Sequence, residues 1–588
     1  MSDAGSIARQ VLSGEATAES IARDALSRIT DYDKVQPQVW ISRFPDDKLL
    51  ELARAIDARV KAGEDLPLAG VPIAVKDNID VYGLPTTAAC PDFYYEPSSN
   101  AAVVDQLLHA GALIVGKTNL DQFATGLMGT RSPYGISGCA FNREFISGGS
   151  SGGSAIAVAA GLVPIALGTD TAGSGRVPAA INGLFGFKPS PGRWSTSGVV
   201  PACRSLDCVS VFALSAQDAA LVDSVLAVFD RKDPYSRKRT DAPIGSVVTI
   251  GIAQPGQLQF ETPEDKALYH KCLAHWADQG VRLMEVDIAF LLEASELLYQ
   301  GPWVAERTQS VFGQHCVRPD SVHPVVRTIL EEGKKVTGAD TFAGLHQIQS
   351  FRRRAEDLWS KVSAIALPTI PGIVSIADAL TRPLERNSML GRYTNFVNLL
   401  DLAGLAIPTG FRANRTGFGV SLIAPASSDR ALLDWAASLP PPLADQRPDL
   451  DTASTNTVRL AVVGAHLSGM PLHWQLESRE AKLVKRCRTV PAYRLFAMAD
   501  TQPPKPALIR DAAGAAIEVE VYEMTEAAFG WFTSQVPPPL AIGSVEVEGL
   551  GYVKGFVAEP RAIEGAVEVT GYGGWRDYIR DCASAPQD

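Results

Sequence analysis

The chain of 588 residues is 20% charged and 46% hydrophobic, which is typical of a water-soluble globular protein long enough for more than one domain. Its formal net charge of −11 at pH 7 argues against general nucleic-acid binding, which needs a basic surface. The most apolar stretch, residues 155–168, is too short to cross a membrane and contains Pro164, so we expect no membrane association.

The N-terminus and the cysteines bear on the cellular compartment. The first twenty residues show no basic segment followed by an apolar core, so no secretory signal is predicted. Among the eight cysteines only Cys203 and Cys208 lie close together, and their spacing fits no common zinc site. A cytoplasmic protein with reduced thiols is the simplest interpretation.

Helix and strand patterns alternate along the first 170 residues. A helix is predicted at residues 17–32, where Thr17 is a candidate N-cap ahead of helical apolar spacing. The further expected elements are a strand at 71–75 directly before Lys76, a helix at 101–111 ended by Gly111, a strand at 112–116, a helix at 154–162 and a strand at 163–168. This mixture favours an α/β fold.

Two segments rich in glycine and serine follow, SGGSSGGS at 147–154 and GTDTAGSGRVP at 168–178. Glycine permits backbone angles that other residues avoid, so such loops can direct several N–H groups at one oxygen, as an oxyanion hole requires. A phosphate-binding loop would end in Gly-Lys-Ser/Thr, which is missing here, and a flexible linker would not be flanked by long apolar elements. A nucleophile elbow would need a partner histidine, and the sequence singles out none in this region.

The clearest candidate for a domain boundary is residues 439–457, which are rich in proline, aspartate, serine and threonine. We therefore predict a large domain at 1–440, a linker at 441–457 and a small domain at 458–588. Strand patterns at 458–463 and 516–522 indicate that the small domain is β-rich α+β.

Taken together, Lys76, SGGSSGGS and GTDTAGSGR resemble the amidase signature family, with Lys76 lying 74 residues before Ser150 and Ser150 lying 24 before Ser174. Segments 111–126, 181–201, 366–372 and 393–410 extend the resemblance over nearly all of residues 1–430, and the first of them resembles the family's strand followed by a helix. The resemblance implies an α/β amidase signature fold, a mixed central sheet covered by helices. It also implies that Ser174 is the nucleophile, that Ser150 is a bridging serine after a cis peptide bond, and that Lys76 is the base.

These implied roles are chemically coherent. Lys76 must be neutral to accept a proton, and burial among hydroxyl groups lowers the pKa of an amine. Asp77 would point to the opposite face of the strand and need not pair with Lys76. The backbone N–H groups of Thr171, Ala172 and Gly173 would bind the oxyanion, and no metal or organic cofactor is needed. We expect structural roles for Ser151 and Ser154, and a supporting ion pair between Asp170 and Arg176.

Two further segments resemble allophanate hydrolases: LLYQGPWVAERT at 297–308, and the extension beginning VRLAVVGAHLSGMPLHWQL at 458–476 and continuing at 491–498. In this resemblance Tyr299 and Arg307 bind the carboxylate of allophanate, a partner that suits a guanidinium fork. Tyr299 and Arg307 are eight residues apart, so one helical face would carry both. The alternative is that Tyr299 packs at a core edge while Arg307 pairs with Glu306 on a surface helix.

The implied reaction converts allophanate into ammonia and N-carboxycarbamate, which then loses carbon dioxide and ammonia. His466, in a Gly-rich turn of the small domain, is either an acid/base group for the second stage or a histidine that packs against its surroundings. Tyr493 and Arg494 are weaker candidates there. The small domain resembles the barrel of gamma-glutamyl cyclotransferases in fold.

The resemblance also implies a homodimer and a functional link to a biotin-dependent urea carboxylase that supplies the substrate; the sequence has no Ala-Met-Lys-Met biotin site, so we expect that enzyme on a separate chain. Four alternatives remain open. The substrate is another small carboxylated amide, the chain is part of an amidotransferase that acts beside tRNA, it is an inactive scaffold, or the small domain serves only dimerisation. The acidic charge and the C-terminal extension count against an amidotransferase that acts beside tRNA. The intact Lys76, Ser150 and Ser174 count against an inactive scaffold.

Overall fold

The computed structural model describes residues 2–241, 248–314, 317–438, 447–452, 457–479, 481–499 and 501–584. The chain divides into two compact units, Met1–Thr452 and Ala453–Asp588. No helix in the described ranges is both long enough and apolar enough to span a membrane.

A mixed sheet forms the centre of the first unit, and its eleven strands within the described residues run in the order β1-β3-β2-β6-β8-β7-β12-β13-β11-β9-β10. Their bounds are β1 Trp40–Arg43, β2 Pro72–Lys76, β3 Leu113–Thr118, β6 Ile165–Asp170, β7 Phe185–Lys188, β8 Cys208–Ala213, β9 Thr249–Ala253, β10 Arg282–Val286, β11 Ala364–Pro368, β12 Leu402–Phe411 and β13 Gly417–Pro425. A separate hairpin joins β4 Gly138–Cys139 to β5 Asn142–Ile146.

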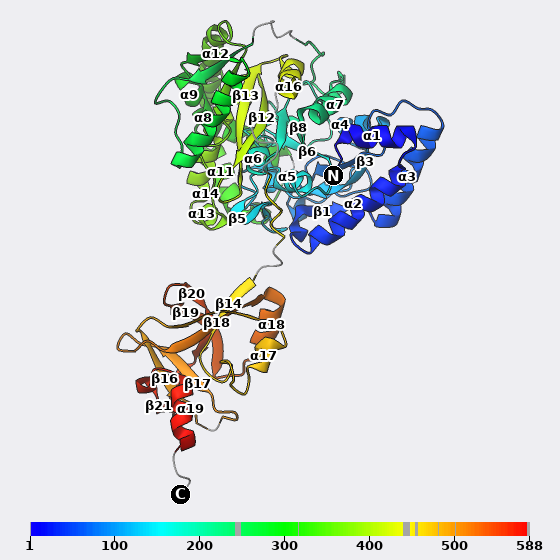
Figure 1. Ribbon diagram of the computed structural model, residues 1–588. Coiled ribbons are helices and arrows are strands. Elements are labelled where there is room, and N and C mark those ends of the chain that lie inside the picture. The colour runs from blue at the N-terminus through cyan, green and yellow to red at the C-terminus, as the bar shows by residue number, and fades with distance from the viewer. Residues whose placement is uncertain are drawn as a thin grey trace. The chain divides into compact units, whose positions relative to one another are not determined.

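Helices surround this sheet (Figure 1). The N-terminal helices gather near β1 and β3, and α5 contacts β2, β3, β6 and β8. The helices of this unit are α1 Ala4–Ser13, α2 Ala18–Asp33, α3 Asp46–Lys61, α4 Ala102–His109, α5 Gly152–Ala159, α6 Val177–Ile181, α7 Ala216–Leu226, α8 Pro263–Asp278, α9 Ala289–Gln300, α10 Trp303–Thr308, α11 Pro324–Gly333, α12 Gly338–Trp359, α13 Ile376–Thr381, α14 Pro383–Gly391, α15 Asn395–Leu399 and α16 Asp429–Ser438. The predicted mixed sheet with covering helices is confirmed.

The strand directions bring two sequence segments together at one edge. β2 runs parallel to β3 and to β6, so the carboxyl ends of β2 and β6 lie side by side. Lys76 is the last residue of β2 and Asp170 the last of β6, so the loop that carries Ser174 begins beside Lys76. All residues of these two strands are buried, as expected for parallel strands covered on both faces.

Local signals account for most element ends. Thr17 caps α2 by accepting a hydrogen bond from the Ser20 N–H, and Gly111 follows α4 with a φ of +87° that favours glycine. The helix expected after the strand within 111–126 is wrong. Gln122–Ala124 form only one 3-10 turn, in which Phe123 has a positive φ of 51°, so an α-helix cannot propagate through it.

The second unit is β-rich with short helices, as predicted. Its larger sheet has the order β15-β18-β14-β20-β19, and its smaller sheet the order β17-β16-β21. The elements are β14 Thr457–Val462, β15 Lys482–Arg488, β16 Tyr493–Ala497, β17 Pro506–Arg510, β18 Glu518–Thr525, β19 Leu540–Val547, β20 Gly551–Ala558, β21 Val567–Glu568, α17 Trp474–Glu477, α18 Glu526–Ser534 and α19 Trp575–Ser584.

Part of the expected linker at 441–457 is packed on the first unit. Residues 441–446 and 453–456 lie outside the described residues, whereas residues 447–452 are described. The Arg447 guanidinium donates to the Ala159 carbonyl at 2.8 Å and lies over the Phe141 ring. The backbone N–H of Asp451 donates to the Ala140 carbonyl, and its carboxylate accepts from the Arg143 N–H.

A buried carboxylate organises the second unit. Glu520 on β18 accepts hydrogen bonds from the Ser468 N–H at 2.7 Å, the Arg576 guanidinium at 2.8 Å and the Arg486 guanidinium at 3.0 Å. Burial raises the pKa of this carboxyl, but hydrogen bonds from Ser468, Arg576 and Tyr522 outweigh burial and lower it to about 2. Glu520 thereby ties β18 to the loop after β14.

We predict that Glu520→Gln destabilises the second unit by about 3 kcal/mol at pH 7, because two arginines lose a buried partner. The folded carboxyl has a pKa of about 2 against an ordinary value of 4.5, so its contribution is complete above pH 4.5 and is lost as the pH falls toward 2. Calorimetry from pH 7 to pH 3 measures both effects. Glu523→Gln on the same strand, where the side chain is 36% exposed, is the control and should have little effect.

Candidate active site

Lys76 and Ser150 meet in the interior of the first unit. Lys76 Nζ lies 2.7 Å from Ser150 Oγ and 2.7 Å from Thr169 Oγ1. Ser150 belongs to the glycine-rich loop before α5, and the peptide bond between Gly149 and Ser150 is cis. Lys76 and Ser150 are each 0% exposed, so bulk water does not reach the contact between them.

The amine of Lys76 is set up to be neutral near physiological pH. Burial lowers its pKa to about 7, although the charges of Asp121, Asp170 and Asp207 oppose that shift. Asp77, the neighbour in sequence, points away and pairs with Lys117 at 3.1 Å. Lys76 therefore has hydroxyl groups rather than a carboxylate within hydrogen-bond reach.

Ser174 lies in the loop between β6 and α6. Its Oγ is 3.5 Å from the carbonyl oxygen of Gly126, which is long for a hydrogen bond between a hydroxyl and a carbonyl. The described residues show no direct hydrogen bond between Ser174 and Ser150. The structure therefore joins Lys76 to Ser150 directly and brings Ser174 to the same buried region without closing the chain of hydroxyls.

The backbone N–H groups before Ser174 are only partly free. The Gly173 N–H donates to Asp170 Oδ1 at 2.8 Å, whereas those of Thr171 and Ala172 have no acceptor among the described residues. Gly173 has a φ of +134°, and a Cβ there would lie 2.4 Å from Thr394 Oγ1. The backbone N–H groups of Thr171 and Ala172 are thus the ones available to an oxygen of a ligand, while Gly173 shapes the loop.

Asp170 and Arg176 form the expected ion pair. The carboxylate of Asp170 accepts from Arg176 Nε at 2.9 Å and Nη2 at 3.0 Å, a two-point contact that is fully buried. Asp170 also accepts the backbone N–H of Gly173 and of Gly175. The pair therefore fixes the backbone on both sides of Ser174.

The serines of the other loop are structural, as expected: Ser151 Oγ donates to the Thr169 carbonyl and Ser154 Oγ to the Leu167 carbonyl.

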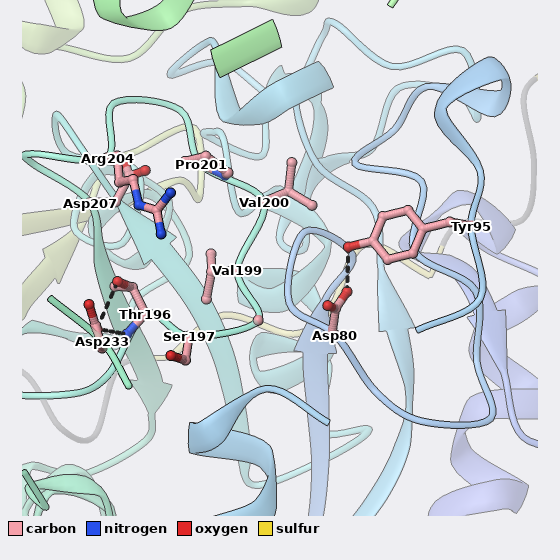
Figure 2. A pocket seen from close by; sticks show the side chains of 11 residues that line it. Asp80, Tyr95, Thr196, Ser197, Val199, Val200, Pro201, Arg204, Asp207 and Asp233 are labelled. Carbon is pink, nitrogen blue, oxygen red and sulfur yellow. Dashed lines mark hydrogen bonds between the residues drawn. The ribbon is translucent and has the colours of Figure 1, made fainter. Parts of the chain in front are cut away.

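Thr171 is fixed by a third acidic residue, Asp207. The Thr171 hydroxyl donates to Asp207 Oδ1 at 2.5 Å, and burial raises the pKa of the Asp207 carboxyl to about 6 despite this bond. Asp207 also lines a polar pocket of about 260 Å³, shown in Figure 2. The Tyr95 hydroxyl in this pocket donates to Asp80 at 2.6 Å. Asp207 thus contacts the loop before Ser174 through Thr171 and also lines this pocket.

Tyr299 and Arg307 do not share one helix, contrary to expectation. Helix α9 ends at Gln300 and α10 begins at Trp303, because Pro302 has no N–H with which to continue a helix. The Arg307 guanidinium nevertheless lies 5.4 Å from the centre of the Tyr299 ring. Arg307 is 1% exposed and donates to Thr125 Oγ1 at 3.1 Å, whereas Glu306 accepts from Ser205 instead of pairing with it.

In the second unit His466 lines a small cavity together with Lys505 and Phe556. Its Nε2 is 2.9 Å from Gln475 Oε1, and its ring stacks on Phe556 at 5.1 Å. Burial lowers the pKa of His466 below its usual value. The weaker candidates are not free: Tyr493 OH accepts the Glu546 N–H, and Arg494 pairs with Glu568 and Asp511.

Sequence reasoning missed several residues at this site: Thr125, Thr169 and Asp207. Thr169 precedes Ser174 within the glycine-rich segment, so its proximity could have been inferred. Thr125 lies inside the segment 111–126 that extends the family resemblance, but nothing in that segment singled it out, and Asp207 lies in a segment with no pattern of its own; only the fold places them here.

Comparison with known proteins identifies family models that match each of the two parts of the chain. Residues 24–433 match the family model described as "Amidase", and residues 458–580 match that of the "Allophanate hydrolase C-terminal domain". Urea amidolyase of Saccharomyces cerevisiae is 44% identical over 94% of this chain, which spans 32% of that protein. The chain thus spans about a third of the length of that relative.

Two other relatives are matched over most of their own length. The structure of Kluyveromyces lactis allophanate hydrolase is similar with a TM-score of 0.68 and 40% identity, over 97% of this chain and 98% of that one. Mandelamide hydrolase of Pseudomonas putida is 30% identical over 71% of this chain and 87% of its own length. The chain therefore belongs to the amidase family.

Proposed function

We propose that this protein hydrolyses allophanate, urea-1-carboxylate, with Ser174, Ser150 and Lys76 as its catalytic residues. One observation carries the choice of substrate. The buried cation Arg307 contacts Thr125, and the carbonyl of the next residue, Gly126, lies 3.5 Å from the nucleophile Ser174. Arg307 therefore offers a buried cation near the nucleophile, to which the carboxylate of a small amide would bind. The similarity to allophanate hydrolases at both ends of the chain supports the same substrate.

The first half of the reaction forms an acyl-enzyme. Neutral Lys76 accepts the proton of Ser150, which accepts that of Ser174, and Ser174 Oγ attacks the unsubstituted carbonyl of allophanate. The N–H groups of Thr171 and Ala172 stabilise the oxyanion. The proton returns to the leaving nitrogen, and ammonia departs.

In the second half a water molecule, deprotonated by the same relay, attacks the acyl carbonyl and releases Ser174. The product is N-carboxycarbamate. This compound loses carbon dioxide to give carbamate, which breaks down to ammonia and a second carbon dioxide. Allophanate thus yields two ammonia and two carbon dioxide molecules.

We assign the breakdown of N-carboxycarbamate to the cavity at His466. His466, whose pKa is lowered by burial, and the half-buried Lys505 line this cavity, so a proton-exchanging group and a cation are available to the anionic product there.

The chemistry further implies an enzyme that carboxylates urea to make the substrate, which we infer to be a biotin-dependent urea carboxylase in the same cytoplasm. A homodimer is the inferred assembly. The nearest alternative is an amidase for another small carboxylated amide, because Arg307 would recognise any such carboxylate.

The substrate assignment predicts fast ammonia release from allophanate and slow release from biuret, a neutral amide of similar size, because biuret offers no carboxylate to Arg307. Ser174→Ala should lower the rate on allophanate by at least about 10⁴-fold, since the nucleophile is lost. Coupled ammonia assays measure both. Equal turnover of both amides would contradict the substrate assignment, and an active Ser174→Ala would contradict the nucleophile.

The lowered pKa of Lys76 predicts how kcat/KM depends on pH. The reaction needs neutral Lys76, and its pKa is about 7, so kcat/KM should fall tenfold per unit below pH 7 and level off above it. Lys76→Ala should lower kcat by about 10²- to 10⁴-fold. Kinetics from pH 5.5 to 9.5 test this. A profile without this limb, or an unchanged limb in Lys76→Ala, would show that Lys76 is not the base.

The assignment of His466 predicts a change in product rather than in acylation. His466→Ala should leave the first ammonia release within about 2-fold and let N-carboxycarbamate accumulate, since only its later breakdown is slowed. Carbon-13 NMR of labelled substrate, with ammonia counted in parallel, distinguishes the two stages. If His466→Ala converts allophanate fully to carbon dioxide at the native rate, His466 has only a packing role.

A further inference from the structure

Buried arginines of the first unit fall into two groups. Five have at most 5% of their surface exposed. Three of these pair with a carboxylate at 2.9 Å or less: Arg176 with Asp170, Arg193 with Asp223, and Arg412 with Asp265. The other two, Arg131 and Arg307, have no carboxylate within 4.0 Å among the described residues. One of the two unpaired arginines is therefore Arg307, the proposed ligand of the substrate carboxylate. The other, Arg131, has been given no function so far.

A buried cation without an anion is costly, because desolvation is not repaid by a partner charge. Asp121 does not supply that charge directly, since its Oδ1 accepts the backbone N–H of Arg131 rather than the guanidinium. Arg131 and Arg307 each also have a buried Nε–H group without an acceptor in the described structure. Both features are expected where a bound anion completes the site.

The two arginines converge on one residue. Arg131 Nη1 donates to the carbonyl of Thr125 at 2.9 Å, and Arg307 Nη1 donates to its hydroxyl at 3.1 Å. Burial lowers the pKa of Arg131, and Tyr299 and Arg307 lie close enough for their charges to influence it too. Thr125 is followed by Gly126, whose carbonyl faces Ser174. Both cations therefore lie near the nucleophile.

We propose that Arg131 is a second binding residue for the substrate carboxylate, so that two arginines and Tyr299 together select amides that carry this anion. This inference rests on the proposed function, because it assumes that the carboxylate binds at Arg307. Arg131 determines specificity here. It would raise the discrimination between a carboxylated amide and its neutral counterpart without taking part in proton transfer.

Arg131 also has structural contacts, which any test must separate from binding. Its Nη2 donates to the Pro383 carbonyl at 2.9 Å, so the side chain joins the loop at 125–131 to the start of α14. A purely structural role would lower the turnover of all amides alike. A binding role lowers turnover only for substrates with a carboxylate.

The experiment compares malonamate with malonamide, which differ in a carboxylate against a neutral amide, and includes allophanate. Arg131→Met should lower kcat/KM for malonamate and allophanate by about 10- to 100-fold, mainly through KM, because a charged hydrogen bond is lost. Turnover of malonamide should stay within about 3-fold. Arg131→Lys should restore part of the preference, since it keeps the charge but loses the fork.

Arg412→Met is the matched control, because Arg412 is equally buried but paired with Asp265. It should destabilise the chain and leave the substrate preference unchanged. An Arg131→Met variant with the native preference, or one that loses malonamide and malonamate turnover equally, would overturn the proposal; should that variant not fold, a native preference in Arg131→Lys would do so. A native enzyme that ignores allophanate and malonamate alike would instead contradict the proposed function.

Discussion

The arrangement of the candidate site depends on a lysine amine that is completely buried and forms no ion pair with a carboxylate in the described part of the chain. Lys76 ends β2 between β3 and β6, and its amine donates to the hydroxyls of Ser150 and Thr169. Desolvation alone would remove the charge, and nearby acids moderate that effect so that the pKa is about 7. An amine in this condition can accept a proton in neutral solution and return it.

The acids around Lys76 are each occupied by another group. Asp170 binds Arg176 and two backbone N–H groups, Asp121 accepts the N–H of Gly129 and of Arg131, and Asp207 binds Thr171. Each therefore influences the lysine by its charge without forming an ion pair with it. The same bonds shape the loops that carry Ser150 and Ser174, so the electrostatics and the geometry of the site have one structural origin.

Much of the fold and the core of the site could be predicted from the sequence, for identifiable reasons. Ser150 and Ser174 lie in short segments of unusual composition, the roles of these serines and of Lys76 came from the family resemblance, and capping at Thr17 and Gly111 is local chemistry. The helix expected near Gln122 was wrong because the backbone at Phe123 adopts a positive φ, which no residue pattern announced. The prediction that one helix carries both Tyr299 and Arg307 was wrong, because the helix is interrupted at Gly301–Pro302 despite the helical spacing. Arg131 and Arg307 come from distant segments, so only the assembled fold shows that they meet at Thr125. In the same way only the fold brings Asp207 to Thr171.

The short segment at 447–452 has a consequence for how the two units can be separated. Arg447 and Asp451 bind Ala159 and Ala140, and Leu450 packs against the core around Phe141. Phe141 also makes an edge contact with Phe411. Residues 447–452 thus serve as a strap on the catalytic unit. A cut at Ser438 would strip this strap and uncover apolar surface, whereas a cut after Thr452 would leave that unit with its own outer layer intact.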